Sequence, residues 1–96
     1  MIKKIAIYGA GDMGRLLYEE IKDSDIEVAY FADRNGEGLH QVDDIPVVPL
    51  QEIPQMEDVD GMIITPAGNY DAIYKALVKI VPEMRMIYIK DAVYEF

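Results

Sequence analysis

The segment GAGDMG at residues 9–14 constrains the fold of this chain more than any other feature, because its glycines follow the spacing G-x-G-x-x-G. Between a strand and a helix, the first glycine of such a run permits a sharp turn, the second lets the backbone approach a pyrophosphate, and the third lets the helix pack close to the strand. The helix directs free N–H groups and a positive dipole end at the phosphates. We therefore predict a phosphate cradle, with a tight turn that holds no ligand as the alternative. Its candidate cofactor-binding residues are Gly9, Ala10, Gly11, Asp12, Met13 and Gly14.

The residues on either side of this loop have the expected patterns. Residues 5–8 are apolar on both faces, which is typical of a central strand covered on both sides in a parallel sheet. After the loop, apolar residues recur at helical spacing, which predicts an amphipathic helix of about three turns. The stripe predicted to be buried is Met13, Leu16, Leu17 and Ile21.

An acidic residue stands where a dinucleotide fingerprint requires one. Residues 27–32 form a second strand-like run, and Asp33 follows it about 20 residues beyond Gly14, the position of the acid that binds ribose hydroxyls. Since Asp-Arg-Asn-Gly is also good turn sequence, a turn-forming role for Asp33 is the alternative. Arg34 could instead meet a 2′-phosphate, so NAD and NADP both stay open, with NAD slightly favoured by the acid.

The second half of the chain continues the alternation after an irregular stretch. Residues 36–54 carry three prolines and predict a loop with a brief edge strand at Val47-Val48 and at most one helical turn near residues 50–53. Residues 61–65 and 86–89 read as two further strands. The helix between them is expected to be capped by Asn69 and stopped by Pro82. Its predicted buried stripe is Tyr70, Ile73, Tyr74, Leu77 and Val81.

Strands that alternate with helices predict one α/β domain over residues 1–96: a Rossmann-like, doubly wound parallel sheet of about five strands in the order 3-2-1-4-5, with helices on both faces. Ligands of such sheets bind beyond the carboxyl ends of the strands where the order reverses, here between the first and fourth strands. That rule adds Thr65 and Pro66, at the end of the fourth strand, to the candidate cofactor-binding residues.

The charge balance excludes some partners. Lys and Arg total 9 against 18 Asp and Glu, so the net charge of −9 would repel nucleic acid and anionic membranes. No apolar run approaches the roughly 20 residues that span a bilayer, and we expect a cytoplasmic protein. The same charge slightly repels a dinucleotide, so phosphate affinity would have to come from local N–H groups.

No catalytic or metal-binding constellation is visible in the sequence. The chain has no cysteine and hence no thiolate nucleophile. Tyr18 and Lys22 match a Tyr-x-x-x-Lys spelling, but both fall on the first predicted helix, where helical spacing explains them. We predict no catalytic residue, no metal site and no catalysis by the isolated domain.

The stretches KKIAIYGAGDMGRLLYEEI, EVAYFADRN, IPVVPLQEI and VDGMIIT resemble the small Rossmann-like domains of bacterial polysaccharide-biosynthesis proteins. The resemblance covers residues 2–89 and is nearest to the N-terminal domain of CapD-like nucleoside-diphosphate-sugar dehydratases and epimerases; N-terminal domains of sugar O-acyltransferases are similar. In the former family the loop would cradle NAD(P), and in the latter it would hold a nucleotide sugar together with the acid after the second strand. No second catalytic unit and no β-helix accompany it here, so the resemblance implies a binding domain.

The end of the chain predicts association. Residues 87–96, within and after the last predicted strand, carry Tyr88, Val93, Tyr94 and Phe96, and a five-stranded sheet has an open edge there. A homodimer, or a further domain of a larger parent protein, would cover that edge.

Overall fold

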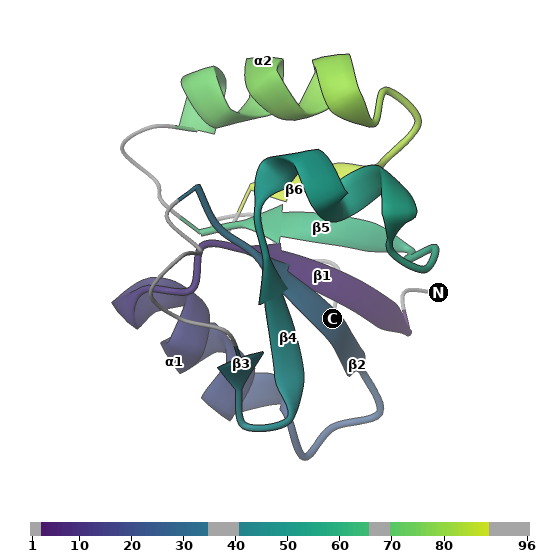
Figure 1. Cartoon of the computed structure of the whole chain (residues 1–96). Helices are drawn as coiled ribbons and strands as arrows, with labels where there is room; N and C mark the ends of the chain where they lie inside the picture. Colours follow the sequence, from purple (N-terminus) through teal and green to yellow (C-terminus); the bar gives the residue numbers. More distant parts are fainter. Residues whose placement is uncertain (1–2, 35–40, 66–69, 89–96) are drawn as a thin grey trace.

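The computed structural model of this chain describes residues 3–34, 41–65 and 70–88, and in them one six-stranded sheet carries helices on both faces (Figure 1). Helix α1 covers one face, and helix α2 covers the other together with the short 3-10 helix η1. The elements, in chain order, are β1 Lys4–Tyr8, α1 Asp12–Ile21, β2 Glu27–Ala32, β3 Gln41–Val42, β4 Ile45–Val48, η1 Leu50–Gln55, β5 Gly61–Ile64, α2 Tyr70–Ile80 and β6 Met86–Tyr88.

The strand order is β3-β4-β2-β1-β5-β6, and every neighbouring pair except β3 with β4 is parallel. The five parallel strands stand in the predicted order 3-2-1-4-5, so the Rossmann-like α/β fold is confirmed. Strand β1 lies between β2 and β5, and its carboxyl end is therefore the point where the order reverses. No helix among the described residues has the length and apolarity needed to cross a bilayer.

Of the segment predicted over residues 36–54, residues 36–40 lie outside the described residues, and the prediction for the rest was wrong in two respects. Strand β3 pairs antiparallel with β4 and covers it, so β4 is not the edge and the sheet has six strands rather than five. The turn between them holds Asp43 at φ 52, a left-handed conformation that Asp tolerates better than most residues, and its carboxylate accepts a hydrogen bond from the Tyr18 hydroxyl at 2.8 Å. The helical segment η1 spans six residues instead of one turn. A contact with α1 thus supports a hairpin that local pattern did not indicate.

Strand β1 contributes to two cores because its side chains alternate between the faces of the sheet. Ile5 and Ile7 belong to the cluster under α1, while Ala6 and Tyr8 belong to the cluster under η1 and α2. All four are at most 5% exposed. The expectation of a central strand that is apolar on both faces is confirmed.

The predicted buried stripes need correction on both helices. Met13 and Leu16 are 51% and 57% exposed, and α1 instead turns Gly14, Tyr18 and Ile21 to the sheet. The cause is the close approach of Gly14 to the β1–α1 turn, which sets the rotation of the helix about its axis. On α2, Tyr74 is 42% exposed and stacks on Tyr70 at a centroid distance of 5.9 Å, leaving Leu77 as the fully buried residue.

The amino ends of β1 and β5 are joined by Asp60, which gives a testable pH dependence. Its Oδ2 accepts hydrogen bonds from the N–H groups of Lys3 and Lys4 at 2.8 and 2.9 Å. These two bonds hold the pKa of the Asp60 carboxyl below its usual 3.8. A depressed native pKa stabilises the fold above the unfolded pKa, and this stabilisation is lost as the pH falls through the native pKa.

We expect Asp60→Asn to lower the free energy of unfolding at pH 7, because the amide forms weaker bonds to the two N–H groups than the carboxylate does. The difference from wild type should shrink below about pH 4, where the wild-type carboxyl becomes protonated. Urea unfolding of both proteins between pH 7 and pH 3 measures it. A difference that is independent of pH would contradict this account.

Candidate functional site

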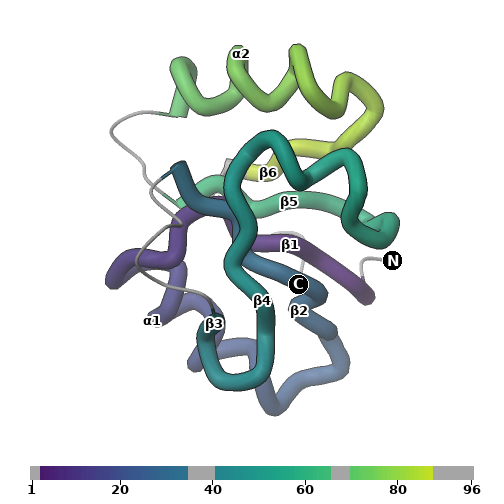
Figure 2. Tube along the Cα trace, in the orientation of Figure 1, coloured from purple at the N-terminus to yellow at the C-terminus, as the bar shows by residue number. Residues whose placement is uncertain are grey.

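The turn from β1 into α1 lies at the carboxyl ends of the central strands. Figure 2 shows this turn at the same end of the sheet as the ends of β2 and β5. The N–H of Gly9 donates to the carbonyl of Ala32 at 2.7 Å, so the turn is joined to the end of β2. The structure thus puts the glycine loop at the position where ligands bind in sheets of this kind.

Two of the three glycines are required by the fold itself. Gly9 has φ 104, a conformation that side chains other than hydrogen rarely allow. A Cβ on Gly14 would lie 1.8 Å from the carbonyl oxygen of Gly9, so the close packing of α1 on the turn leaves no room for a side chain. These are the sharp turn and the helix–strand approach that the spacing predicted.

Gly11 is different, because nothing in the fold requires a glycine there. It is exposed, its φ and ψ of −80 and −161 are open to any residue, and a Cβ would meet no atom within 4 Å. Gly11 is also the N-cap of α1 and offers no side-chain hydrogen bond to the first turn. The open space above Gly11 is where the fingerprint places a pyrophosphate.

The first turn of α1 supplies backbone donors. The N–H of Arg15 donates to the carbonyl of Gly11 at 3.0 Å, whereas the N–H groups of residues 12–14 come too early in the helix to have an intrahelical acceptor. Two exposed charged side chains flank these donors. The Asp12 carboxylate lies in the first turn, and the Arg15 guanidinium follows three residues later. An anion at this helix end would gain from the dipole and from Arg15, and would be opposed by Asp12.

Asp33, the acid that the fingerprint assigns to ribose hydroxyls, lies against the glycine loop. Its Oδ2 accepts a hydrogen bond from the N–H of Ala10 at 2.7 Å, and its own N–H donates to the carbonyl of Val48 at 3.0 Å. The loop contact was missed by sequence reasoning, which assigned Asp33 to a ribose or to a turn. The signal that could have revealed it is the parallel register: since Ala32 pairs with Tyr8, Asp33 falls beside the residues that follow β1.

Tyr8 is a further residue of this region that the sequence marked only as part of a strand. It ends β1 and is 5% exposed. Burial raises the pKa of its hydroxyl, Arg34 opposes that rise, and Asp33 adds to it. Both charges are thus within electrostatic reach of the hydroxyl, which stays protonated at neutral pH. Arg34 itself is exposed at the end of β2.

Thr65, at the end of β5, links that strand to the end of β1. It is 2% exposed, and both its N–H and its Oγ1 donate to the carbonyl of Tyr8, at 3.1 and 2.7 Å. The hydroxyl therefore fastens the ends of β1 and β5 together, and a contact of Thr65 with a ligand stays a prediction. Pro66 and the proposed cap Asn69 lie outside the described residues.

Because the fold requires a glycine at position 14 but not at position 11, alanine at the two positions should affect stability unequally. Gly14→Ala should destabilise the protein by about 1–3 kcal/mol, because the backbone must move apart to admit the methyl group. Gly11→Ala should cost less than about 1 kcal/mol, the small penalty of Ala at an N-cap. Thermal unfolding of both variants measures the difference. Equal losses would mean that the packing of α1 on the turn is not as close as described.

Comparison with known proteins identifies the family of this chain but names no activity for it. No match to this chain is found among curated proteins. A family model described as C2185-like, N-terminal, matches residues 1–88, which include all the described elements and the whole glycine loop. Because that match covers most of the sequence, the chain belongs to the C2185-like N-terminal domain family.

Proposed function

We propose that this domain binds a nucleotide through its pyrophosphate at the glycine loop, with NAD or NADP as the first choice, and that it is not catalytic by itself. The observation that carries the proposal is Gly11. It is a glycine that neither the backbone conformation nor the packing requires, and it stands exposed at the N-cap of α1, at the carboxyl ends of the sheet. Glycine is also moderately favoured at an N-cap, and close approach of a ligand to the backbone is the other physical reason for a glycine there.

The groups around Gly11 suit the phosphates and the ribose of a dinucleotide. The first-turn N–H groups of α1 would bind the phosphates, and Asp33, already held against Ala10, would accept the ribose hydroxyls. Arg34, exposed at the end of β2, is the residue available to a 2′-phosphate. With a net charge of −9 the protein as a whole would oppose the ligand, so binding would depend on these local groups.

A nucleotide sugar is the alternative ligand, since it carries the same diphosphate and ribose. The setting that we propose is sugar-nucleotide or polysaccharide biosynthesis. Its support is the resemblance to the N-terminal domains of CapD-like enzymes and sugar O-acyltransferases. The family description itself names no activity.

The first test of this proposal is Gly11→Val. A thermal-shift screen with NAD, NADP, UDP-glucose and coenzyme A identifies the best ligand, which should stabilise the chain by about 2.7 kcal/mol at 100 times its dissociation constant. Valine should weaken that ligand roughly tenfold or more, because its methyl groups occupy the space of the pyrophosphate, while the unfolding temperature of the free protein changes little. Glu20→Gln, an exposed change on the same helix, is the matched control. Unchanged calorimetric affinity in Gly11→Val would refute the loop as the phosphate site.

The second test separates NAD from NADP at Asp33. Asp33→Asn keeps an oxygen that can accept the Ala10 N–H but removes the negative charge. NAD affinity should fall, since an amide is a weaker partner for the ribose hydroxyls, and NADP affinity should fall less or rise because repulsion of the 2′-phosphate is relieved. Calorimetric titration of both cofactors measures the ratio. Equal changes for both would return Asp33 to a purely structural role.

Assembly is a second candidate function, and it does not exclude the first. The observation that favours it is the exposure of Met13 and Leu16, two large apolar residues one turn apart on α1. We infer a homodimer or a neighbouring domain of a larger protein as the partner. Of the C-terminal residues predicted to take part, Val93, Tyr94 and Phe96 lie outside the described residues.

A further inference from the structure

The Tyr8 side chain is almost completely buried, yet its hydroxyl has no partner in the described part of the chain. The side chain is 5% exposed and belongs to the apolar cluster between the sheet and the layer of η1 and α2. The backbone carbonyl of Tyr8 accepts two hydrogen bonds from Thr65, but no bond among the described residues reaches the Tyr8 hydroxyl. Because buried hydroxyls are usually hydrogen-bonded, water or a ligand has to supply the partner.

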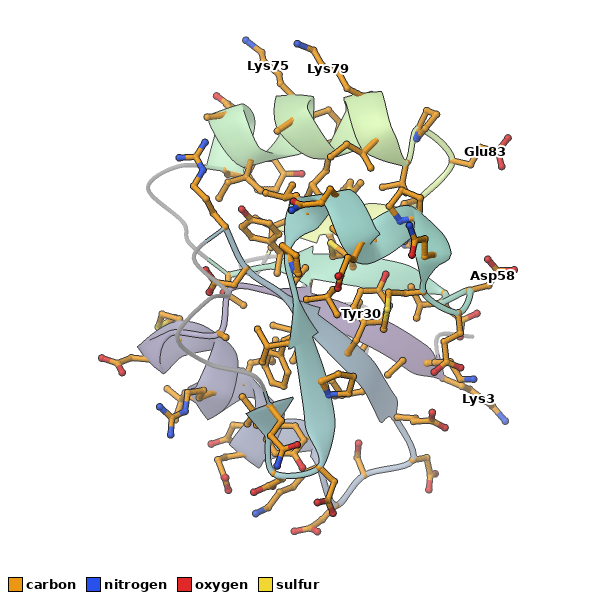
Figure 3. All side chains as sticks on the ribbon, in the orientation of Figure 1. Lys3, Tyr30, Asp58, Lys75, Lys79 and Glu83 are labelled. Atoms are coloured by element: carbon orange, nitrogen blue, oxygen red, sulfur yellow. The ribbon has the colours of Figure 1, made fainter. Side chains whose placement is uncertain are left out.

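The Tyr8 hydroxyl differs from that of Tyr30, which lies on the same face of the sheet. Tyr30 is 0% exposed, and in the described part of the chain its hydroxyl is the one fully buried side-chain oxygen or nitrogen without a partner. Figure 3 shows Tyr30 beneath η1, in the middle of the molecule. Since the Tyr8 hydroxyl also lacks a partner there, it must belong to the exposed part of its side chain. It is therefore the accessible polar tip of a buried ring.

The position of Tyr8 in the sheet places this tip at the end that carries the glycine loop. Tyr8 ends β1, and it pairs with Ala32 and Ile64, which end β2 and β5. The surface nearest to the tip is therefore formed by the segments that follow these three strands. Burial raises the pKa of Tyr8, and the smaller opposing effects of Arg34 and Asp33 agree with this placement, because both residues directly follow β2.

The tip lies in line with the nucleotide proposed above, and the inference rests on that proposal. There the diphosphate lies over Gly11 and the ribose lies at Asp33, whose carboxylate accepts the N–H of Ala10. The turn from Gly11 back to Tyr8 leads from α1 on one face of the sheet to the cluster under η1 and α2 on the other. Because diphosphate, ribose and base follow one another in a nucleotide, the base would extend over the end of β1 toward the Tyr8 hydroxyl.

An exposed aromatic ring is present on the same face and near the same end. Helix α2 follows β5, so it begins on the side of the carboxyl ends of the strands. Its first residue, Tyr70, packs against the cluster that contains Tyr8 and stacks on Tyr74, which is 42% exposed. Bases stack on exposed aromatic rings of this kind. The surroundings of the tip are therefore compatible with a flat, aromatic ligand group.

We propose that Tyr8 is a base-binding residue of the nucleotide site, with its hydroxyl hydrogen-bonded to the edge of the nucleobase. A phenol hydroxyl can donate and accept, so it suits the ring nitrogens and exocyclic groups of a purine or a pyrimidine. Because the ring is packed in the core, the hydroxyl is held in place before the ligand binds, and little conformational entropy is lost. Tyr8 thus adds a contact with the base to those of the glycine loop and Asp33.

The matched variants Tyr8→Phe and Tyr30→Phe test this contact. Each removes one hydroxyl without a protein partner and keeps its ring in the same cluster, so both free proteins should unfold at a temperature equal to or above that of the wild type. We titrate ADP, UDP and inorganic pyrophosphate into each ¹⁵N-labelled full chain and follow the amide NMR signals. Tyr8→Phe should weaken the tighter nucleotide roughly three- to tenfold, as expected for one hydrogen bond, and leave pyrophosphate unchanged. Tyr30→Phe should change neither.

Different results would contradict the base contact and the nucleotide site itself. If the nucleotide shifts residues 9–15 and binds Tyr8→Phe as tightly as wild type, the base contact is refuted and the nucleotide site stands. Equal weakening in Tyr30→Phe, or a matching loss of pyrophosphate in Tyr8→Phe, would also refute the base contact, because the effect would then not depend on the base. If neither ADP nor UDP shifts residues 9–15 of the wild type, the proposed function fails and the base contact fails with it.

Discussion

The contact between Gly14 and the carbonyl of Gly9 is the constraint on which much of this structure depends. It lets α1 lie directly on the end of β1 and fixes which side of the helix faces the sheet. That rotation brings the Tyr18 ring edge-on to Phe31 at 5.8 Å and its hydroxyl to Asp43, which supports the hairpin of β3 and β4. It also turns Met13 outward, so one close backbone contact decides both the core and an apolar surface.

The two ends of the parallel sheet have different chemistry. At the carboxyl ends, backbone N–H groups at the start of α1 and the open space over Gly11 favour an anion, while Asp33 holds the loop by accepting the N–H of Ala10. At the amino ends, the exposed carboxylates Asp58 and Glu83 lie among the described residues that line a cavity with apolar walls. The strand direction separates these features, because loops that follow strands and loops that precede them lie at opposite edges.

Much of the fold could be predicted because its signals are local. Two-sided apolar runs and turn residues indicated the five parallel strands, and the right-handed crossover rule gave their order. The hydrogen bond between the loop and Asp33 was not predicted, because it depends on the register between two parallel strands. Strand β3 could not be predicted, because two residues carry no periodicity and their pairing depends on a turn whose Asp43 is bonded to α1. Met13, Leu16 and Tyr74 were misassigned, since helical spacing defines a stripe but not the direction in which the helix turns it.

The sequence by itself determined the class of fold and the identity of the loop, because glycine spacing, strand patterns and the acid after β2 act over short distances along the chain. Only the tertiary structure distinguished the glycines: Gly9 and Gly14 are needed by the backbone and its packing, and Gly11 is not. It likewise turned the Thr65 hydroxyl inward to Tyr8 and buried the Tyr30 hydroxyl without a hydrogen-bond partner among the described residues. Such contacts depend on how separate elements pack, and no local pattern records that packing.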